Sequence, residues 1–250
     1  MTAPPAKAPM ARLDRLLANL GYGSRREVTA LVAGGRVVLD GATLKDAGAK
    51  IPVAADLPQR LTIAGQPVDP PAPLTLLMHK PLGVVCSHRE AGRSVYELLP
   101  ARWRARIPAL SSIGRLDMET SGLLLITDDG PLLHRVISPR SNIAKRYQAT
   151  LDRPLEGHEA ERFAAGTLIL EGDTDPLAPA VLEPTGSRTA NLTITEGRYH
   201  QVRRMFAAVG NHVTGLHRDR IGHLSLPADL PGGEFRILGE TELALVFQRV

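Results

Sequence analysis

The sequence predicts a mixed α+β protein built from two domains. Apolar residues recur at helical spacing in some segments and form strand-like runs in others, and the two kinds of segment alternate along the chain. A proline-rich bridge, Pro67 to Pro73, divides the chain, and such a composition suits a semi-rigid linker. The length of 250 residues, 43% of them apolar, is enough for a medium domain and a small one. We therefore expect a small domain at residues 11–68 and a larger one at residues 74–250.

The small domain should contain two short helices and a small sheet. The first ten residues are rich in Ala and Pro and lack the apolar core of a secretion signal, so residues 1–10 are expected to form a disordered tail. Ser24 is placed to cap the second helix, which should end at Gly34-Gly35. Residues 36–41 read as a strand entering a turn, with further strand signals to about Val68. The apolar faces of the two helices are Leu13, Leu16, Leu17 and Leu20, then Val28, Leu31 and Val32.

The larger domain alternates strand-like and helical segments. Strands are expected at Leu74 to Met78, Gly122 to Thr127, Arg146 to Leu151, Asn191 to Thr195 and Phe235 to Leu238. Helices are expected near Pro131 to Val136, Leu155 to Ala165 and His200 to Val209.

Charge and composition exclude several classes of function. The formal net charge is only +4, so a polyanionic partner would have to meet local basic patches, such as the five Arg and three His between Arg198 and Arg220. Basic runs are also common on solvated faces. The single cysteine, Cys86, allows no intramolecular disulfide, and the eight His are scattered rather than clustered as metal ligands. No apolar window is long enough to span a bilayer. We expect a cytoplasmic protein that uses neither a metal nor a cofactor.

The segment GRLDMETSG, residues 114–122, is the most informative feature of the chain. It holds Asp117 among small residues in a turn that leads into the apolar run at residues 123–126. Gly114 and Gly122 allow a close approach of the backbone, so the carboxylate can be presented rigidly to a bulky ligand. Ordinary turn chemistry, with side-chain oxygens capping local N–H groups, is the alternative.

This segment resembles the catalytic motif of pseudouridine synthases of the RsuA/RluA type. Further matches follow in the family's order: KPLGVVCS at 80–87, KRY at 145–147, EGRYHQVRRMF at 196–206, NHV at 211–213 and LHRDRIG at 216–222. The resemblance implies a mainly antiparallel central sheet with the active-site cleft across its face. It also implies an enzyme that isomerises uridine to pseudouridine in RNA.

The resemblance assigns roles to individual residues. Asp117 is the essential carboxylate, Arg203 its cationic neighbour, and Tyr147 packs on the uracil and assists removal of the C5 proton. Arg115 fills the gap left by the flipped base. The remaining substrate-binding residues implied are Leu216, Ile221, Arg198 and His200. The alternatives on pattern alone are a core tyrosine for Tyr147, a surface arginine for Arg203 and a structural salt bridge for Arg115.

The small domain resembles the S4 RNA-binding domain. The matching strings are RLDRLLA at 12–18, SRRE at 24–27 and GRVVLDG at 35–41. The resemblance implies that basic residues beside the helices meet RNA phosphates, namely Arg12, Arg15, Arg25 and Arg26. A small helical cap with solvated arginines is the alternative.

Within the family, the chain is most similar to the synthases of small-subunit ribosomal RNA. Tyr199-His200 stands where large-subunit enzymes tend to carry Asn-Arg, and the run FAAVGNHV at 206–213 points the same way. One departure is Arg203, where the small-subunit enzyme carries a lysine. The resemblance implies 16S ribosomal RNA as the partner, with uridine 516 as the target, and we expect a monomer. A synthase of 23S RNA and a non-catalytic assembly protein that binds ribosomal RNA remain alternatives, whereas a methyltransferase lacks its Gly-rich cofactor loop.

Overall fold

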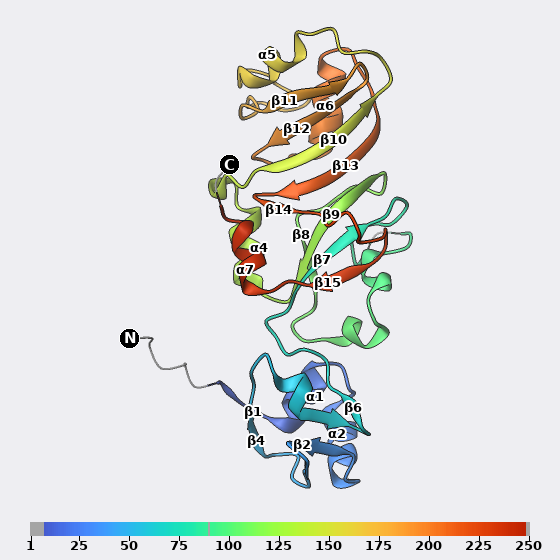
Figure 1. The fold of residues 1–250 in the computed structure, drawn as a ribbon, viewed down its shortest axis with the longest axis vertical. Coiled ribbons are helices and arrows are strands. Elements are labelled where there is room, and N and C mark those ends of the chain that lie inside the picture. Colours follow the sequence, from blue (N-terminus) through green and yellow to red (C-terminus); the bar gives the residue numbers. More distant parts are fainter. Residues whose placement is uncertain (1–7, 90, 249–250) are drawn as a thin grey trace, which may run out of the picture. The chain divides into compact units, whose positions relative to one another are not determined.

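The chain forms two compact units, seen in a computed structural model that describes residues 8–89 and 91–248 (Figure 1). The first unit runs to Leu74 and also includes Leu99–Ser111. The second consists of Thr75–Leu98 and the chain from Ser112 onward.

The first unit combines two helices with small sheets. Strand β1 (Met10–Arg12) pairs antiparallel with β4 (Lys50–Pro52), and four more strands follow the order β3-β2-β5-β6. These strands are β2 (Val37–Leu39), β3 (Ala42–Thr43), β5 (Leu61–Ile63) and β6 (Gln66–Pro67). The helices are α1 (Leu13–Asn19), α2 (Arg25–Ala33) and the short α3 (Leu57–Arg60), which the apolar pattern did not predict. The predicted apolar faces of α1 and α2 are confirmed, because all their members but the partly buried Leu31 are buried in one core.

The predicted cap of α2 is confirmed by its geometry. The hydroxyl of Ser24 accepts a hydrogen bond from the backbone N–H of Glu27, and the Glu27 carboxylate accepts one from the backbone N–H of Ser24. This reciprocal capping box satisfies two N–H groups that a helix start leaves unpaired.

The amino-terminal boundary differs from the expected tail of residues 1–10. Residues 1–7 lie outside the described residues, but Met10 belongs to β1 and the carbonyl of Pro9 accepts a hydrogen bond from Val53 N–H. Backbone pairing with β4 orders these two residues, and their Ala/Pro-rich surroundings give no sign of that pairing.

Residues 99–111, expected within the larger domain, pack in the first unit. The N–H of Ile107 donates to the carbonyl of Asn19, and the Arg102 guanidinium pairs with Asp69 at 2.6 Å. The same guanidinium lies over the ring of Tyr22, 4.4 Å from its centroid. These contacts are polar and join residues distant in sequence, so the spacing of apolar residues along the chain could not predict them. The domain ranges 11–68 and 74–250 stay a prediction.

The second unit is organised on one large sheet of nine strands within the described residues. Its main path is β11-β12-β10-β13-β9-β7-β15, with β14 added to β13 and β8 to β9. The strands are β7 (Thr75–Lys80), β8 (Ser111–Ile113), β9 (Thr120–Thr127), β10 (Lys145–Leu151), β11 (Val181–Gly186), β12 (Thr189–Ile194), β13 (Val213–Ile221), β14 (Leu224–Ser225) and β15 (Phe235–Ile237). The pairing of β13 with β9 is parallel, and the other pairings reported for the main path are antiparallel. The mixed α+β class with a mainly antiparallel sheet is therefore confirmed.

Helices of the second unit pack against this sheet. They are α4 (Gly130–Ile137), α5 (Glu159–Ala164), α6 (Gln201–Ala208) and α7 (Glu240–Leu245), with the 3₁₀ turns η1 (Val95–Leu98), η2 (Ala101–Ala105, in the first unit) and η3 (Pro139–Ser141). Leu132 and Val136 of α4 share a buried cluster with Leu77, Leu123 and Leu125 of the sheet. The helix expected at Leu155 to Ala165 begins later, at Glu159, and β11, β13 and α7 had no counterpart in the sequence prediction.

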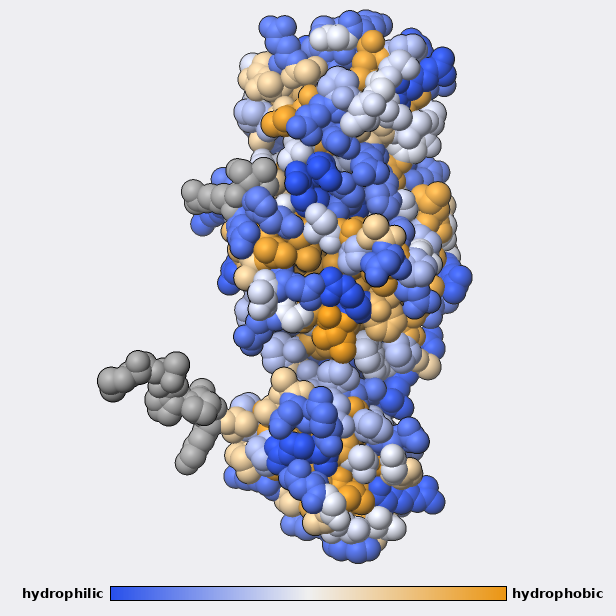
Figure 2. Space-filling model, in the orientation of Figure 1, coloured by the Kyte–Doolittle hydropathy of each residue, from blue (hydrophilic) through white to orange (hydrophobic). Residues whose placement is uncertain are grey.

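The surface carries no broad apolar face on the side shown in Figure 2. In each unit, apolar patches are separated by hydrophilic residues. Among the helices that the structure describes, none has the length and apolar content needed to cross a membrane.

Candidate active site

Asp117 lies in the turn that joins β8 to β9. The turn closes through a hydrogen bond of 3.0 Å from the N–H of Thr120 to the carbonyl of Asp117. The side chain of Asp117 is 34% exposed, so its carboxylate is open to a ligand rather than enclosed. A bound ligand would therefore have to exclude water from this carboxylate.

The turn is fixed by a lysine of the KPLGVVCS motif, to which the sequence analysis assigned no role. Lys80, at the end of β7, is fully buried and donates to the carbonyls of Pro81, Asp117 and Thr120 at 3.1, 2.9 and 2.8 Å. Burial lowers the pKa of the Lys80 ammonium, and the nearby Asp117 charge partly opposes that shift. One side chain therefore ties both ends of the Asp117 turn to strand β7.

Removing this tie should impair catalysis more than folding. We expect Lys80→Met to lower the turnover rate roughly 100-fold, because a misplacement of about 1 Å in a reacting group has an effect of that size. Lys145→Met is the matched control, since Lys145 is a second largely buried lysine whose ammonium donates only to the carbonyl of Ile143. Single-turnover rates of both variants, beside their melting temperatures, test this; equal losses in the two would refute the role of Lys80.

Strand β13 links the region of the Asp117 turn to Tyr147, another of the predicted site residues. It lies between β9 and β10, and its Arg218 is opposite Gly122 on one side and Tyr147 on the other. Gly122 has φ +113°, and a Cβ there would lie 2.6 Å from the backbone nitrogen of Arg218. The glycine therefore allows a close approach of the two strands, whereas the sequence analysis expected it to allow close approach to a ligand.

Arg218 is a buried cation that the sequence argument missed. Its side chain donates to the carbonyl of Leu123 at 2.9 Å and to the hydroxyl of Tyr147 at 3.3 Å. Tyr147 is 8% exposed and Arg218 only 2%. Together with burial, which is the larger cause, the charge of Arg218 lowers the pKa of Lys145 to about 8. The polar run HRDR around Arg218 gave no local signal that this side chain would be buried.

The expected ion pair between Arg203 and Asp117 is not formed. Arg203 instead donates to the carbonyls of Glu119 and Val213, both at 2.9 Å, because its guanidinium reaches the backbone of the turn rather than the carboxylate. The Asp117 carboxylate is met instead by His200, whose Nε2 lies 3.4 Å from Oδ1. Arg203 thus braces the Asp117 turn, and its catalytic role stays a prediction.

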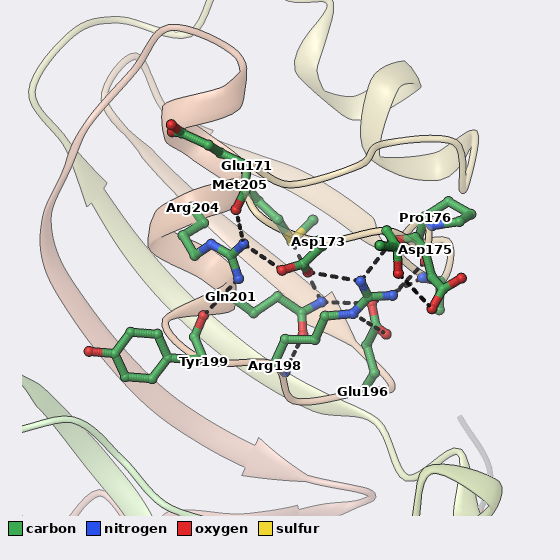
Figure 3. A network of polar contacts seen from close by, with 12 residues as sticks. Glu171, Asp173, Asp175, Pro176, Glu196, Arg198, Tyr199, Gln201, Arg204 and Met205 are labelled. Atoms are coloured by element: carbon green, nitrogen blue, oxygen red, sulfur yellow. Dashed lines mark hydrogen bonds and ion pairs between the residues drawn. The ribbon is translucent and has the colours of Figure 1, made fainter.

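Arg198 is engaged in a polar network at the start of α6 (Figure 3). Its guanidinium meets the carboxylates of Asp173 and Glu196 at 2.9 and 3.4 Å. It also donates to the carbonyls of Asp175 and Pro176. These contacts give Arg198 a structural role, because they join the residues before α6 to residues 173–176. Its contact with substrate stays a prediction.

The other predicted substrate residues are spread over the same unit. Arg115 is exposed in the Asp117 turn. Leu216 is 7% exposed on β13, opposite Thr120 of β9 and Ala149 of β10. Ile221 belongs to the apolar cluster that includes α4. Ile221 therefore contributes to the core that supports the sheet.

In the first unit, a buried carboxylate orients two of the four predicted arginines. Asp14 pairs with Arg12 at 3.0 Å and with Arg25 at 2.6 Å. Hydrogen bonds from Arg12 and then Arg25 hold the pKa of Asp14 well below its usual range. Both arginine side chains remain more than half exposed, and Arg15 and Arg26 are exposed as well. The four arginines therefore remain available to an anionic partner.

No metal site emerges from the parts of the chain that the structure describes. No group of three or more His, Cys, Asp or Glu side chains converges there as metal ligands would. What the second unit offers is the partly exposed carboxylate of Asp117 on a braced turn, flanked by a histidine and, across strand β13, by a tyrosine bonded to a buried arginine.

This fold and site belong to a known class. Residues 75–208 match the RNA pseudouridylate synthase family, and residues 11–56 match the S4 domain. The chain therefore belongs to the RNA pseudouridylate synthase family and carries an amino-terminal S4 domain, as the motifs predicted.

Several relatives match along nearly their whole length. The ribosomal small subunit pseudouridine synthase A of Escherichia coli is 42% identical over 240 residues, which is 94% of this chain and 99% of the relative. Its namesake from Vibrio cholerae is 40% identical, covering 95% and 100%. The uncharacterized RNA pseudouridine synthase YtzG of Bacillus subtilis is 41% identical, covering 94% and 98%. A crystal structure of a pseudouridylate synthase is 35% identical with a TM-score of 0.66, covering 94% and 99%.

Proposed function

We propose that this protein isomerises a specific uridine of 16S ribosomal RNA to pseudouridine, with Asp117 as the reacting carboxylate. The proposed target is uridine 516. The observation that carries the proposal is the exposed carboxylate of Asp117 on its braced turn, in a chain 42% identical to a small-subunit synthase.

The reaction breaks the bond between N1 of uracil and C1′ of ribose and joins C5 to C1′. The proton leaves C5 and N1 gains one, so no oxidant or cofactor is consumed. Cleavage creates positive character at C1′, which the Asp117 carboxylate can attack or stabilise. In an alternative route the same carboxylate removes the 2′ proton. Both routes need Asp117 ionised and close to the sugar.

The neighbours of Asp117 suit the later steps. Tyr147 presents a hydroxyl whose lone pair already accepts from Arg218, so its position on β10 is fixed. We propose that its ring packs on the uracil and its hydroxyl helps to move the C5 proton. The target base must leave its stack to reach this site, at a cost of a few kcal/mol. The exposed Arg115 is proposed to occupy the space that the base vacates.

The first unit is proposed to bind RNA phosphates through Arg12, Arg15, Arg25 and Arg26. Apolar surface on the face in Figure 2 is broken into separate patches, which favours a monomer. Because the proposed substrate is ribosomal RNA, free or within an assembling small subunit, we propose that the protein acts in the cytoplasm.

The decisive experiment maps pseudouridine in unmodified 16S and 23S ribosomal RNA after incubation with the wild type or Asp117→Ala. Carbodiimide-dependent stops of primer extension report each modified position. A single 16S stop that requires Asp117 supports the proposal. A stop in 23S instead would transfer the same chemistry to the large subunit, and no stop in RNA or in assembly particles would favour a binding-only protein.

The role of Asp14 makes a prediction opposite to simple charge counting. Asp14→Asn removes a negative charge from the basic surface, yet we expect RNA affinity to fall by roughly 5-fold, because Arg12 and Arg25 lose the charge-assisted bonds that orient them. Asp56→Asn removes the same charge at an exposed position and is the control, with unchanged or slightly higher affinity expected. Filter binding at one fixed salt concentration compares the two; a gain in affinity for Asp14→Asn would contradict the positioning role.

A further inference from the structure

Tyr199 presents an aromatic ring to solvent at the edge of the active site. Its relative exposure is 73%, the highest among the large apolar side chains noted as exposed in the described residues. The ring stacks on the imidazole of His200, with centroids 3.9 Å apart and an angle of 16° between the planes. His200 in turn lies 3.4 Å from the Asp117 carboxylate. The exposed tyrosine is therefore one ring away from the proposed reacting group.

We propose that Tyr199 is a stacking platform for the base of an unpaired nucleotide adjacent to the target uridine. The inference rests on the proposed function for the identity of the RNA. It adds a binding site for a second nucleobase and makes Tyr199 a determinant of substrate affinity.

The platform is held rigidly from below. His200 adopts a left-handed backbone conformation, φ +49°, which a residue other than glycine keeps only when its surroundings enforce it. Arg204 enforces it by donating to the carbonyl of Tyr199, while its other nitrogen binds Asp173 at 2.7 Å and the carbonyl of Glu171. Figure 3 shows the Tyr199 ring directed away from this network. The network holds the backbone of Tyr199 and makes no contact with its ring that Figure 3 shows.

Such an arrangement suits a nucleobase in particular. His200 covers one side of the tyrosine ring, and the large exposed fraction leaves ring surface for one more planar group. Flipping the target uridine removes a stacking partner from its neighbour, which then gains from a new aromatic surface. Because the platform is preformed, little ordering of the protein opposes binding. Arg203 on the following helix donates to backbone carbonyls and adds positive charge for the RNA backbone, whereas the charge of Arg204 is paired with Asp173.

Kinetics of substituted enzymes test the platform. Wild type, Tyr199→Phe, Tyr199→Leu and Tyr199→Ala are compared in single-turnover reactions on an unmodified 16S RNA fragment. We expect Tyr199→Ala to raise the half-saturating enzyme concentration roughly 10- to 100-fold with little change in the maximal rate, as for loss of one stacked base. Tyr199→Phe should behave as wild type and Tyr199→Leu should resemble Ala. Val181→Ala, at an exposed position on edge strand β11, is the control without effect.

A second set of reactions locates the base. Fragments with an abasic nucleotide on the 5′ or the 3′ side of the target are given to wild type and to Tyr199→Ala. At the stacking position, the abasic change should raise the half-saturating concentration of the wild-type enzyme as much as Tyr199→Ala does. In the Tyr199→Ala enzyme the same abasic change should raise it no further. Full additivity at both positions, or a leucine variant as good as phenylalanine, overturns the platform.

The two proposals can fail separately. If wild type modifies the RNA and Tyr199→Ala does so with unchanged half-saturation, the platform is overturned and the proposed function stands. If no ribosomal RNA is modified, anisotropy of a labelled single-stranded oligouridylate replaces turnover. A loss of affinity in Tyr199→Ala but not in Tyr199→Phe then supports the platform alone, and equal affinities overturn it.

Discussion

Asp117→Asn should abolish pseudouridine formation, with a loss of roughly 10⁴-fold or more, as is typical for removal of a reacting group. Asparagine keeps the size of the side chain but can neither form a bond to C1′ nor accept a proton from C2′. The backbone of the turn should not change, because Lys80 holds the carbonyl of residue 117 and not its carboxylate. The melting temperature and the affinity for RNA should therefore stay close to those of wild type.

Glu119→Gln is the matched control for this loss. Glu119 is an exposed carboxylate two residues away in the same turn, and only its backbone carbonyl is used by Arg203. We expect its turnover to remain within about twofold of wild type, since an exposed side chain away from the reacting atoms contributes little. Single-turnover rates on 16S RNA are measured for both variants. Residual activity above one percent in Asp117→Asn would exclude this carboxylate as the reacting group.

The local patterns of the sequence predicted much of the fold. Ser24 and Glu27 stand three residues apart at the start of α2, and this spacing alone defines a capping box. Strands β7 and β9 contain unbroken apolar runs, residues 76–78 and 123–126, because both faces of the sheet are covered there, so composition identifies them. In such cases the signal and the structure depend on the same few neighbouring residues.

Strand β13 shows where that logic stops. It is a central strand, yet it reads His217-Arg218-Asp219-Arg220 in its second half, which resembles a solvated loop. Partners from other segments offset much of the cost of these charges: Arg218 donates to Leu123 and Tyr147, and Asp219 pairs with Arg146. Partners that are 71 to 95 residues apart cannot be inferred from spacing along one strand.

The candidate site divides in the same way. The motifs identified Asp117 and Tyr147 as residues of interest, but the direction of each side chain depends on tertiary contacts. Arg203 was expected to meet the Asp117 carboxylate and instead donates to Glu119 and Val213. The bracing by Lys80 and the burial of Arg218 become visible only when the sheet is assembled.

Gly122→Ala should have the largest effect on stability of any single methyl group added near the site. We expect a loss of about 3 kcal/mol or more, because two costs add. The backbone at φ +113° is unfavourable for alanine, and the new Cβ would overlap the backbone of Arg218 on the neighbouring strand. The atoms that the Cβ would meet belong to the main chain of Arg218, and the position of a Cβ is fixed by its own backbone, so no side-chain rotation can relieve the overlap.

Gly114→Ala separates the two costs. Gly114 also has a positive φ, +68°, in the same Asp117 segment, but no atom lies within 4 Å of a Cβ built there. It should therefore lose only the backbone term, about 1 kcal/mol. Urea denaturation of both variants measures the difference between them, which is the cost of separating β9 from β13.

A wider gap between β9 and β13 should also lower the catalytic rate. Residue 122 is paired with Arg218, and Arg218 with Tyr147, so a wider gap between β9 and β13 moves the Asp117 turn relative to the tyrosine. We expect Gly122→Ala to lose nearly all activity even at temperatures where it is still folded, whereas Gly114→Ala should lose far less. Equal stability of the two variants would mean that the sheet adjusts without strain. Close packing of β9 on β13 would then not be what holds Asp117 and Tyr147 in register.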